Sequence, residues 1–139
     1  CYSIRAGHEP LEDTGAFTVA AGLDRKRMRE AIAAILAELR KTTRTPVAAD
    51  ELRRAKDNLR GRTMLAFEDS AAQAEWYGRH WTFLKHLETP EEKLRRIEKV
   101  TPAQIRRVAQ GIFRPEHMAT AVIGPFTKQA IRAMLTKKP

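Results

Sequence analysis

Histidine is the first residue type to consider for metal binding or proton transfer, and the sequence has four: His8, His80, His86 and His117. Two histidines that bind zinc from one helix face stand three or four residues apart, with a third ligand nearby, as in His-Glu-x-x-His or His-x-x-Glu-His. His80 and His86 are six residues apart, so a helix turns them away from each other. The spacing favours surface or packing histidines over a metal site.

Nucleophiles and nucleotide-binding loops find little support in the sequence. Cys1 lies at the chain terminus, near no predicted histidine, and is interpreted as a small apolar residue in a strand. Ser3 and Ser70 have no nucleophile-elbow motif around them, and Ser70 fits the cap of a helix. The glycines form neither Gly-x-Gly-x-x-Gly nor a Walker loop. We therefore assign no catalytic, cofactor-binding or metal residue.

Aromatic and basic side chains raise the question of nucleic-acid binding. Trp76, Tyr77, Trp81 and Phe83 could stack on bases, but at helical spacing such residues more often form a core or an interface. Basic residues recur along the predicted helices but are interrupted by Glu and Asp: Arg25, Lys26, Arg27, Arg29, Arg53, Arg54, Lys56, Arg60 and Arg62. A solvated helix face is favoured over a nucleic-acid patch.

The net charge of +9 and the pI near 10.2 suit an anionic partner, which could be nucleic acid, an acidic membrane surface or acidic peptides.

The single cysteine excludes an internal disulfide and leaves the redox compartment undecided. Residues 1–5 have neither an initiator Met nor the layout of a secretion signal, so we expect that the natural start is missing.

The length of 139 residues and the mass of 15.8 kDa fit one domain with its own core. Hydrophobic residues make up 42% and charged residues 31%, which is too apolar for a disordered chain. We expect a single folded domain over residues 1–139. Apolar runs such as residues 31–37 are far shorter than the roughly 20 residues that cross a bilayer, which predicts no membrane span.

The first half of the chain changes its hydrophobic period once. Residues 2–6 and 16–21 are two extended segments, joined by turn formers and charges at residues 9–15, which predicts a hairpin. From Asp24, a suitable N-cap, the pattern becomes helical. One face of this helix carries Met28, Ile32, Ile35, Leu36 and Leu39. We expect the helix to break within residues 42–46.

Further helix starts follow along the chain. Asp50 and Glu51 lie in the first turn of a second helix, where negative charge opposes the helix dipole favourably. A third helix begins after residues 68–70 and carries the aromatic side chains. Thr89-Pro90-Glu91-Glu92 and Thr101-Pro102-Ala103-Gln104 place Thr at N-cap, Pro at N1 and Glu or Gln at N3. These motifs predict two more helices that begin with capping boxes.

The end of the chain returns to an extended pattern. Residues 118–123 are rich in β-branched side chains and are closed by Gly124 and Pro125, which predicts a buried strand. A last helix is expected after Thr127. Because the final strand must return to the first two, the order of elements indicates an α+β fold, with a sheet under helices.

Five segments carry a family resemblance in their order and spacing: residues 2–7 (YSIRAG), 13–22 (DTGAFTVAAG), 50–61 (DELRRAKDNLRG), 67–79 (FEDSAAQAEWYGR), and 113–115 (FRP) with 121–125 (AVIGP). They resemble the carboxy-terminal domain of the pitrilysin/insulinase peptidases and the mitochondrial processing peptidases. The likeness covers nearly the whole chain. It implies the LuxS/processing-peptidase-like metallohydrolase fold, in which helices pack on one face of the sheet.

The resemblance also implies that zinc catalysis and chamber formation belong to different domains. In such enzymes zinc is held by an inverted His-x-x-Glu-His helix and a downstream Glu, within an amino-terminal domain that precedes this one. Neither motif occurs here, so the resemblance implies no cofactor in this chain and zinc in the missing amino-terminal domain. The chain would be the non-catalytic, substrate-chamber-forming half of a zinc-dependent endopeptidase.

The implied partners are the missing amino-terminal domain, a second subunit of a homodimer or heterodimer, and an extended peptide substrate, with no nucleic acid and no membrane span. The larger insulinase-like relatives position substrate with an Arg/Tyr pair. Its Arg is expected near residues 15–18, where this sequence has none, so that role is not transferred. Ala48 is a second departure, because relatives often place Ser or Thr there to cap the second helix.

Two other functions stay open. The parent could be a metal-free partner or scaffold subunit of a two-component peptidase or a core-protein complex. A basic nucleic-acid-binding domain is less favoured, because it rests only on the charge and the aromatic residues. The compartment is undecided, with the bacterial cytoplasm and the periplasm both open.

Overall fold

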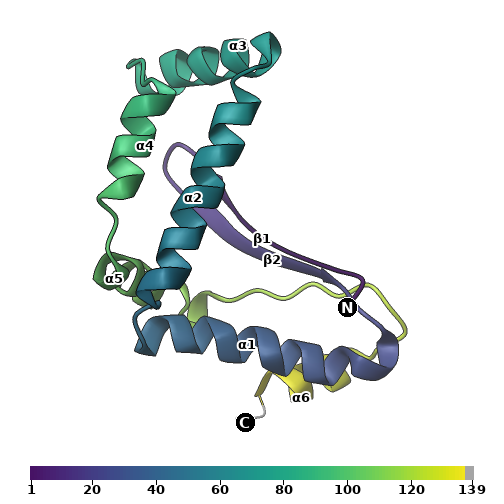
Figure 1. Cartoon of the computed structure of the whole chain (residues 1–139). Helices are drawn as coiled ribbons and strands as arrows, with labels where there is room; N and C mark the ends of the chain where they lie inside the picture. The colour runs from purple at the N-terminus through teal and green to yellow at the C-terminus, as the bar shows by residue number, and fades with distance from the viewer. Residues whose placement is uncertain (137–139) are drawn as a thin grey trace. The chain divides into compact units, whose positions relative to one another are not determined.

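The computed structural model of the chain describes residues 1–136 and divides into two units, whose elements are labelled in Figure 1. Unit 1 combines Cys1–Thr45 with the chain from Arg107 onward, and unit 2 is Pro46–Arg106. The combination of helices with one small sheet agrees with the α+β class. The expectation of one domain over residues 1–139 stays a prediction.

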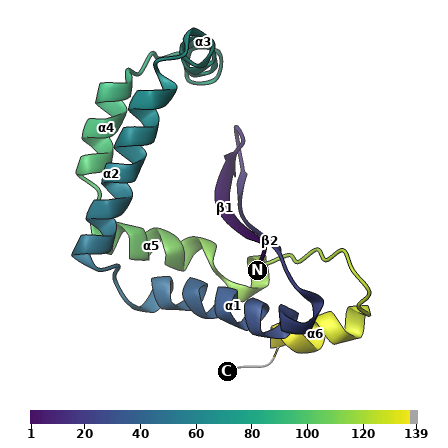
Figure 2. The same ribbon diagram turned by 45° about the vertical axis from the view of Figure 1, so that its right-hand side comes forward.

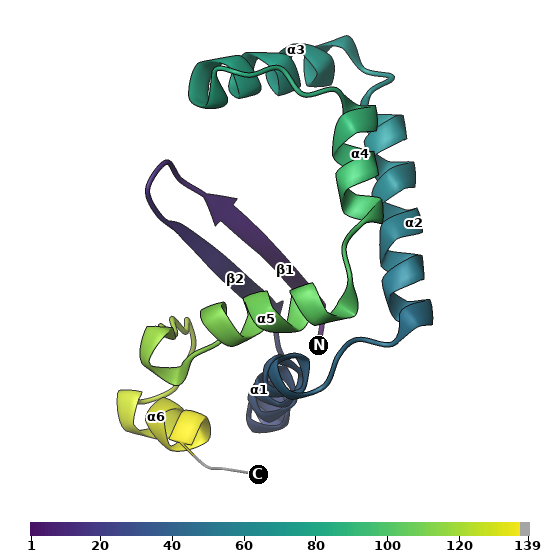
Figure 3. The same ribbon diagram turned by 90° about the vertical axis from the view of Figure 1, so that its left-hand side faces the viewer.

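Unit 1 begins with an antiparallel hairpin of β1 (Ser3–Pro10) and β2 (Gly15–Gly22), which lie side by side in Figure 3. The turn is closed by a hydrogen bond of 2.9 Å from the Leu11 N–H to the Thr14 carbonyl oxygen. The predicted hairpin is therefore confirmed, and both strands are longer than the sequence pattern suggested. Every residue of β1 is exposed to solvent.

The strand predicted at residues 118–123 is wrong. Among residues 1–136, only β1 and β2 form a sheet, and residues 118–123 have no strand hydrogen bonding. Ile123 is fully exposed, with a relative accessibility of 105%. Residues rich in β-branched side chains favour a pleated, half-buried surface, but a strand also needs a neighbouring edge to pair with. This segment has the composition of a strand without a partner, so the sheet has two strands.

The first long helix of unit 1 begins where the sequence predicted. Asp24 caps a single 3-10 turn, η1 (Arg25–Arg27), by accepting a 2.8 Å hydrogen bond from the Lys26 N–H. That turn leads directly into α1 (Met28–Arg44). Met28 is one of the few buried apolar side chains of the described residues.

The end of α1 lies slightly later than the break predicted from residue 42. Thr42 and Thr43 stay helical, and their hydroxyls donate to the carbonyl oxygens of Glu38 and Arg40. Thr45 is the first extended residue, because it precedes Pro46 and a proline disfavours helical backbone at the preceding position.

The carboxy-terminal segment of unit 1 packs against α1 and the hairpin. Helix α6 (Lys128–Thr136), which confirms the helix expected after Thr127, lies beside α1 (Figure 2). The side-chain amide of Gln110 donates to the Thr43 carbonyl oxygen at 3.0 Å. The rings of Phe17 and Phe113 meet edge to face, with centroids 5.0 Å apart. These contacts bring together segments that are far apart in the sequence.

Unit 2 consists of one long helix followed by shorter ones. They are α2 (Ala49–Ala66), α3 (Ser70–Arg79), the π-helical turn η2 (His80–Leu84), α4 (Pro90–Glu98) and the first part of α5 (Pro102–Ile112). Helices α2 and α4 lie side by side (Figure 2), and Lys56 Nζ donates to the Glu98 carbonyl oxygen at 2.6 Å. Among residues 1–136, no helix is both long and apolar enough to cross a membrane.

The helix starts of unit 2 follow local rules. Both capping boxes are confirmed: Thr89 Oγ1 accepts from the Glu92 N–H at 3.2 Å, and Thr101 Oγ1 accepts from the Gln104 N–H at 3.3 Å. The third helix is capped by the Asp69 carboxylate, and Ser70 is its first helical residue. Helix α2 begins after Ala48 without any side-chain cap, although acidic residues occupy its first turn as predicted.

Candidate functional site

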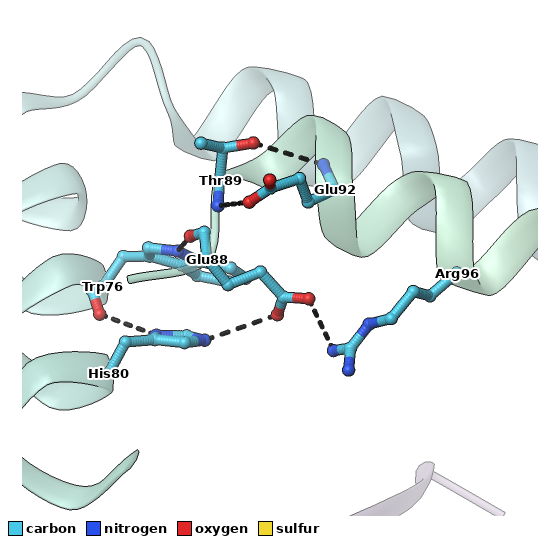
Figure 4. A network of polar contacts seen from close by, with 6 residues as sticks. All are labelled: Trp76, His80, Glu88, Thr89, Glu92 and Arg96. Atoms are coloured by element: carbon cyan, nitrogen blue, oxygen red, sulfur yellow. Dashed lines mark hydrogen bonds and ion pairs between the residues drawn. The ribbon is translucent and has the colours of Figure 1, made fainter. Parts of the chain in front are cut away.

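A cluster of polar contacts is centred on Glu88, in the loop between η2 and α4 of unit 2 (Figure 4). Its carboxylate is buried, with only 10% of the side chain exposed. Arg96 Nη2 lies 2.6 Å from Glu88 Oε1, and His80 Nε2 lies 3.6 Å from Oε2. A buried carboxylate needs such partners, because an unpaired charge is costly away from water.

The backbone of Glu88 is held from the other side by Trp76. The indole Nε1 of Trp76 donates to the Glu88 carbonyl oxygen at 2.7 Å (Figure 4). The rings of Trp76 and His80 are stacked with centroids 4.5 Å apart, and His80 Nδ1 lies 2.8 Å from the Trp76 carbonyl oxygen. Because a carbonyl oxygen only accepts, Nδ1 carries the proton in this contact. Lys93 Nζ lies 4.4 Å from the Trp76 ring centre, in a cation–π contact.

The cluster is better suited to hold the loop than to do acid–base chemistry. Glu88 already accepts from Arg96, and His80 is fixed between Trp76 and Glu88. These contacts join α3 and η2 to α4, because the largely buried side chains of His80 and Glu88 are linked to the exposed Arg96 of α4. We therefore interpret the cluster as a support that positions the surface around it.

The capping box beside the cluster fixes the start of α4. The Thr89 N–H donates to Glu92 Oε2 at 2.9 Å, and this backbone hydrogen bond is the main reason that the pKa of Glu92 lies below its usual value. The positive charge of Arg95 lowers that pKa further. Glu92 is therefore an ionised cap, and its carboxylate is already engaged.

A surface hollow of about 370 Å³ lies beside the cluster, within unit 2. It is lined by Leu84, His86, Glu88, Glu92, Arg95, Arg96 and Lys99. Three of these side chains are cationic, and both acidic ones already have partners in the cluster or in the capping box. We call this site the basic hollow.

A second depression, of about 430 Å³, lies in unit 1 between the hairpin and α1. Its walls are mainly apolar, and they include Ile4, Ala6, Phe17, Val19, Leu23, Ala31, Ala34, Ile35 and Leu39. Charged residues lie at its margin, where Arg27 and Glu30 form an ion pair of 3.1 Å that raises the pKa of Arg27 and lowers that of Glu30. We call this depression the apolar groove.

The structure separates the four histidines into different settings. His8 lies on β1 and His117 in a 3-10 turn (Pro115–His117) of unit 1, whereas His80 belongs to the Glu88 cluster and His86 lines the basic hollow. Within residues 1–136, no group of three or more His, Cys, Asp or Glu is placed to hold a metal ion. The described residues therefore do not fit a zinc site.

The aromatic group predicted on the third helix is split. Trp76 and Tyr77 pack edge to face against Phe67, with ring centroids 5.2 Å and 6.2 Å away. Trp81 and Phe83 lie on the π-helical turn and are exposed. The first pair therefore has the packing role that helical spacing favoured, and the second pair faces solvent.

The other predicted candidates are on the surface. Cys1 is exposed and lines the apolar groove, Ser3 lies on β1, and Ser70 starts α3. Some of the basic residues form ion pairs with carboxylates on their own helices, such as Arg54 with Asp50 at 3.0 Å. This pairing agrees with the solvated-face interpretation of the basic residues.

Sequence reasoning missed Glu88, the centre of the polar cluster. Its partners stand 8 to 12 residues away and come from three elements, so no periodic pattern marks it. The one local signal is its position directly before the Thr89-Pro90 capping box.

Comparison with known proteins gives a consistent set of relatives. Residues 1–59 match the family model described as the peptidase M16 inactive domain. The chain is 31% identical over 134 residues to an uncharacterized zinc protease of Streptomyces coelicolor, covering 94% of this chain and 28% of that protein. It is 31% identical over 126 residues to the mitochondrial-processing peptidase subunit alpha of Pongo abelii, covering 91% of this chain and 24% of that protein.

An uncharacterized zinc protease of Rickettsia bellii is 29% identical over 124 residues, which is 89% of this chain and 30% of that protein. The chain therefore spans between 24% and 30% of the length of these three relatives. All three alignments extend well beyond the segment matched by the family model, into unit 2.

Proposed function

We propose that this chain is the non-catalytic, chamber-forming half of a zinc-dependent endopeptidase. The chain belongs to the pitrilysin-type M16 peptidases, as one of their carboxy-terminal domains. The observation that carries the proposal is the match of residues 1–59 to the inactive domain of that family. The matched segment includes all residues that line the apolar groove. Zinc and the catalytic water would then be supplied by an amino-terminal domain of the parent protein.

The apolar groove supports a role that needs a covering partner. An isolated two-stranded hairpin is at best marginally stable in water, and here every residue of β1 is exposed. Exposed apolar depressions of this kind usually mark protein contacts. We propose that the amino-terminal part of the parent protein covers the groove, and that the completed domain has the LuxS/processing-peptidase-like fold.

The substrate in this account is an extended peptide enclosed between two such halves or subunits. A second candidate is a metal-free partner or scaffold subunit of a two-component peptidase. The similarity to a protein named as the alpha subunit of a processing peptidase favours this candidate, because that name denotes one member of a multi-subunit enzyme. In both cases this chain forms part of the wall of the substrate chamber and contributes no catalytic residue.

Cys1 offers a direct test of the covered groove, because it is the single cysteine of the chain, is exposed, and lines the groove. Alkylation with iodoacetamide, followed by peptide mass mapping, would compare the rate at Cys1 in the 139-residue chain and in the full-length protein. We expect slow alkylation in the full-length protein and a fast rate after its denaturation. Equal rates in the native full-length protein and the isolated chain would contradict a covered groove.

A further inference from the structure

Unit 2 carries a group of exposed apolar side chains that the cluster around Glu88 does not use. Trp81, Phe83, Leu84 and Leu87 are 59%, 68%, 64% and 50% exposed. Three of them belong to the π-helical turn η2, and Leu87 follows three residues later. We call this group the aromatic tip.

The backbone of the aromatic tip departs from regular helix geometry. π-helical turns are rare and often occur at functional sites. Here the turn ends at Lys85, which has the left-handed conformation, with φ 52° and ψ 24°. Side chains other than glycine seldom adopt this conformation. The Glu88 cluster holds both ends of the segment, because His80 begins η2 and Trp76 binds the Glu88 backbone.

The aromatic tip adjoins the basic hollow, since Leu84 belongs to both. Within the described part of the chain, the Lys99 ammonium makes no side-chain hydrogen bond or ion pair. Among the described residues, Arg95 likewise forms no hydrogen bond or ion pair, although its positive charge attracts the Glu92 carboxylate and lowers its pKa. Glu92 is itself already bonded to Thr89. Two cationic side chains therefore remain available beside an exposed apolar surface.

We propose that the aromatic tip and the basic hollow together bind an extended peptide in which an acidic side chain and an apolar one stand two residues apart, so that both lie on the same face of the peptide. The carboxylate would lie between Arg95 and Lys99 and accept charge-assisted hydrogen bonds from them, which are stronger than hydrogen bonds between neutral groups. The apolar side chain would cover Leu84 and Phe83. This surface lies in unit 2, outside residues 1–59, and binding of such a peptide to it would not require that the parent protein be catalytic.

The composition of the hollow favours a peptide over other anionic partners. A nucleic acid needs a run of cations that follows its phosphates, whereas Glu88 and Glu92 interrupt the cations here. A membrane surface would need only diffuse positive charge near apolar anchors, without a bounded hollow. A single carboxylate matches the charge of the hollow, because three cationic side chains line it and its two carboxylates already have partners.

The test is a fluorescence anisotropy titration of the 139-residue chain with a dye-labelled peptide that repeats Leu-Ser-Glu-Ser, which places leucine and glutamate two residues apart on one face. We expect saturable binding that weakens with added salt. Combining Arg95→Ala with Lys99→Ala should weaken binding about tenfold, which is the change expected from loss of a pair of favourable charge contacts. Arg60→Ala is the matched control, because it removes an exposed arginine of α2 outside the hollow.

A separate variant tests the apolar half of the surface. Phe83→Ser should also weaken binding, while circular dichroism shows unchanged helix content, because Phe83 is exposed. Equal affinity for a peptide with glutamine in place of glutamate would overturn the proposal. So would unchanged binding by the Arg95→Ala/Lys99→Ala variant, or tighter binding to phosphatidylserine vesicles or to single-stranded DNA than to the acidic peptide.

Discussion

Arg96 Nη2 lies 2.6 Å from Glu88 Oε1, so an arginine whose side chain is 73% exposed neutralises a carboxylate whose side chain is 10% exposed. Arg96→Ala would leave that buried charge with only the more distant His80. We expect a loss of about 1 to 3 kcal/mol in the free energy of unfolding. Urea unfolding followed by circular dichroism measures it. Arg95→Ala is the control, since Arg95 does not contact Glu88, and equal losses for both variants would contradict the assigned pair.

The two tryptophans are expected to respond differently to the same substitution. Trp76→Phe removes the donor to the Glu88 carbonyl oxygen and should cost about 1 kcal/mol of stability. Trp81→Phe changes an exposed side chain and should leave the unfolding midpoint nearly unchanged. Guanidinium unfolding of both variants, followed by far-ultraviolet circular dichroism, compares them. A larger loss for Trp81→Phe would show that the aromatic tip is packed in solution.

The start of α4 depends on its capping box. Thr89→Ala removes the acceptor for the Glu92 N–H and should destabilise the chain by about 1 kcal/mol, as is typical for a lost threonine cap. Thermal unfolding measures the effect. Thr89→Ser retains the hydroxyl and is the matched control, which should keep most of the stability.

Acid should weaken the same capping box. The pKa of Glu92 is lower in the folded chain than the ordinary value of 4.5, so its contribution to stability is present above that value. The contribution is lost as the pH falls below 4.5 and through the folded pKa. Urea midpoints measured across this range should fall less steeply for Glu92→Gln than for the unmodified chain. Parallel curves would show that Glu92 is not an ionised cap.

These helix starts also show what the sequence could predict. Thr89 and Thr101 contact residues only three positions away, so the motif contains all the information needed for the cap. The hairpin turn is similarly local. In contrast, residues 118–123 have the composition of a strand, but a strand forms only if a distant segment supplies an edge. That requirement cannot be read from the six residues themselves.

The polar cluster was hidden from sequence reasoning for the same reason. Glu88 is positioned by Trp76, His80 and Arg96, which come from α3, η2 and α4. The left-handed Lys85 and the π-helical turn that bring these elements together have no glycine or proline signal. Helical periodicity therefore located the aromatic residues, but could not separate the packed Trp76 from the exposed Trp81.

The apolar groove leads us to expect that the isolated chain associates with itself. Ile4→Lys places a charge on an exposed groove residue and should reduce the association by opposing burial of the groove. Light scattering over a concentration series measures the mass in solution. Leu65→Lys is the matched control, because Leu65 is exposed on α2 and lies outside the groove. A chain that is monomeric at all concentrations would remove this support for a covered groove.

Among residues 1–136 no cluster of side chains is placed to hold a metal ion, so zinc content and peptide cleavage directly test whether this domain is non-catalytic. The 139-residue chain would be equilibrated with zinc, desalted and analysed by mass spectrometry for metal content, and then assayed for cleavage of an extended fluorogenic peptide. A non-catalytic domain is expected to retain no stoichiometric zinc and to leave the peptide intact, because it lacks a paired histidine ligand set that could hold zinc and thereby activate a water. A tightly held zinc in each chain, together with cleavage that a chelator abolishes, would contradict the account.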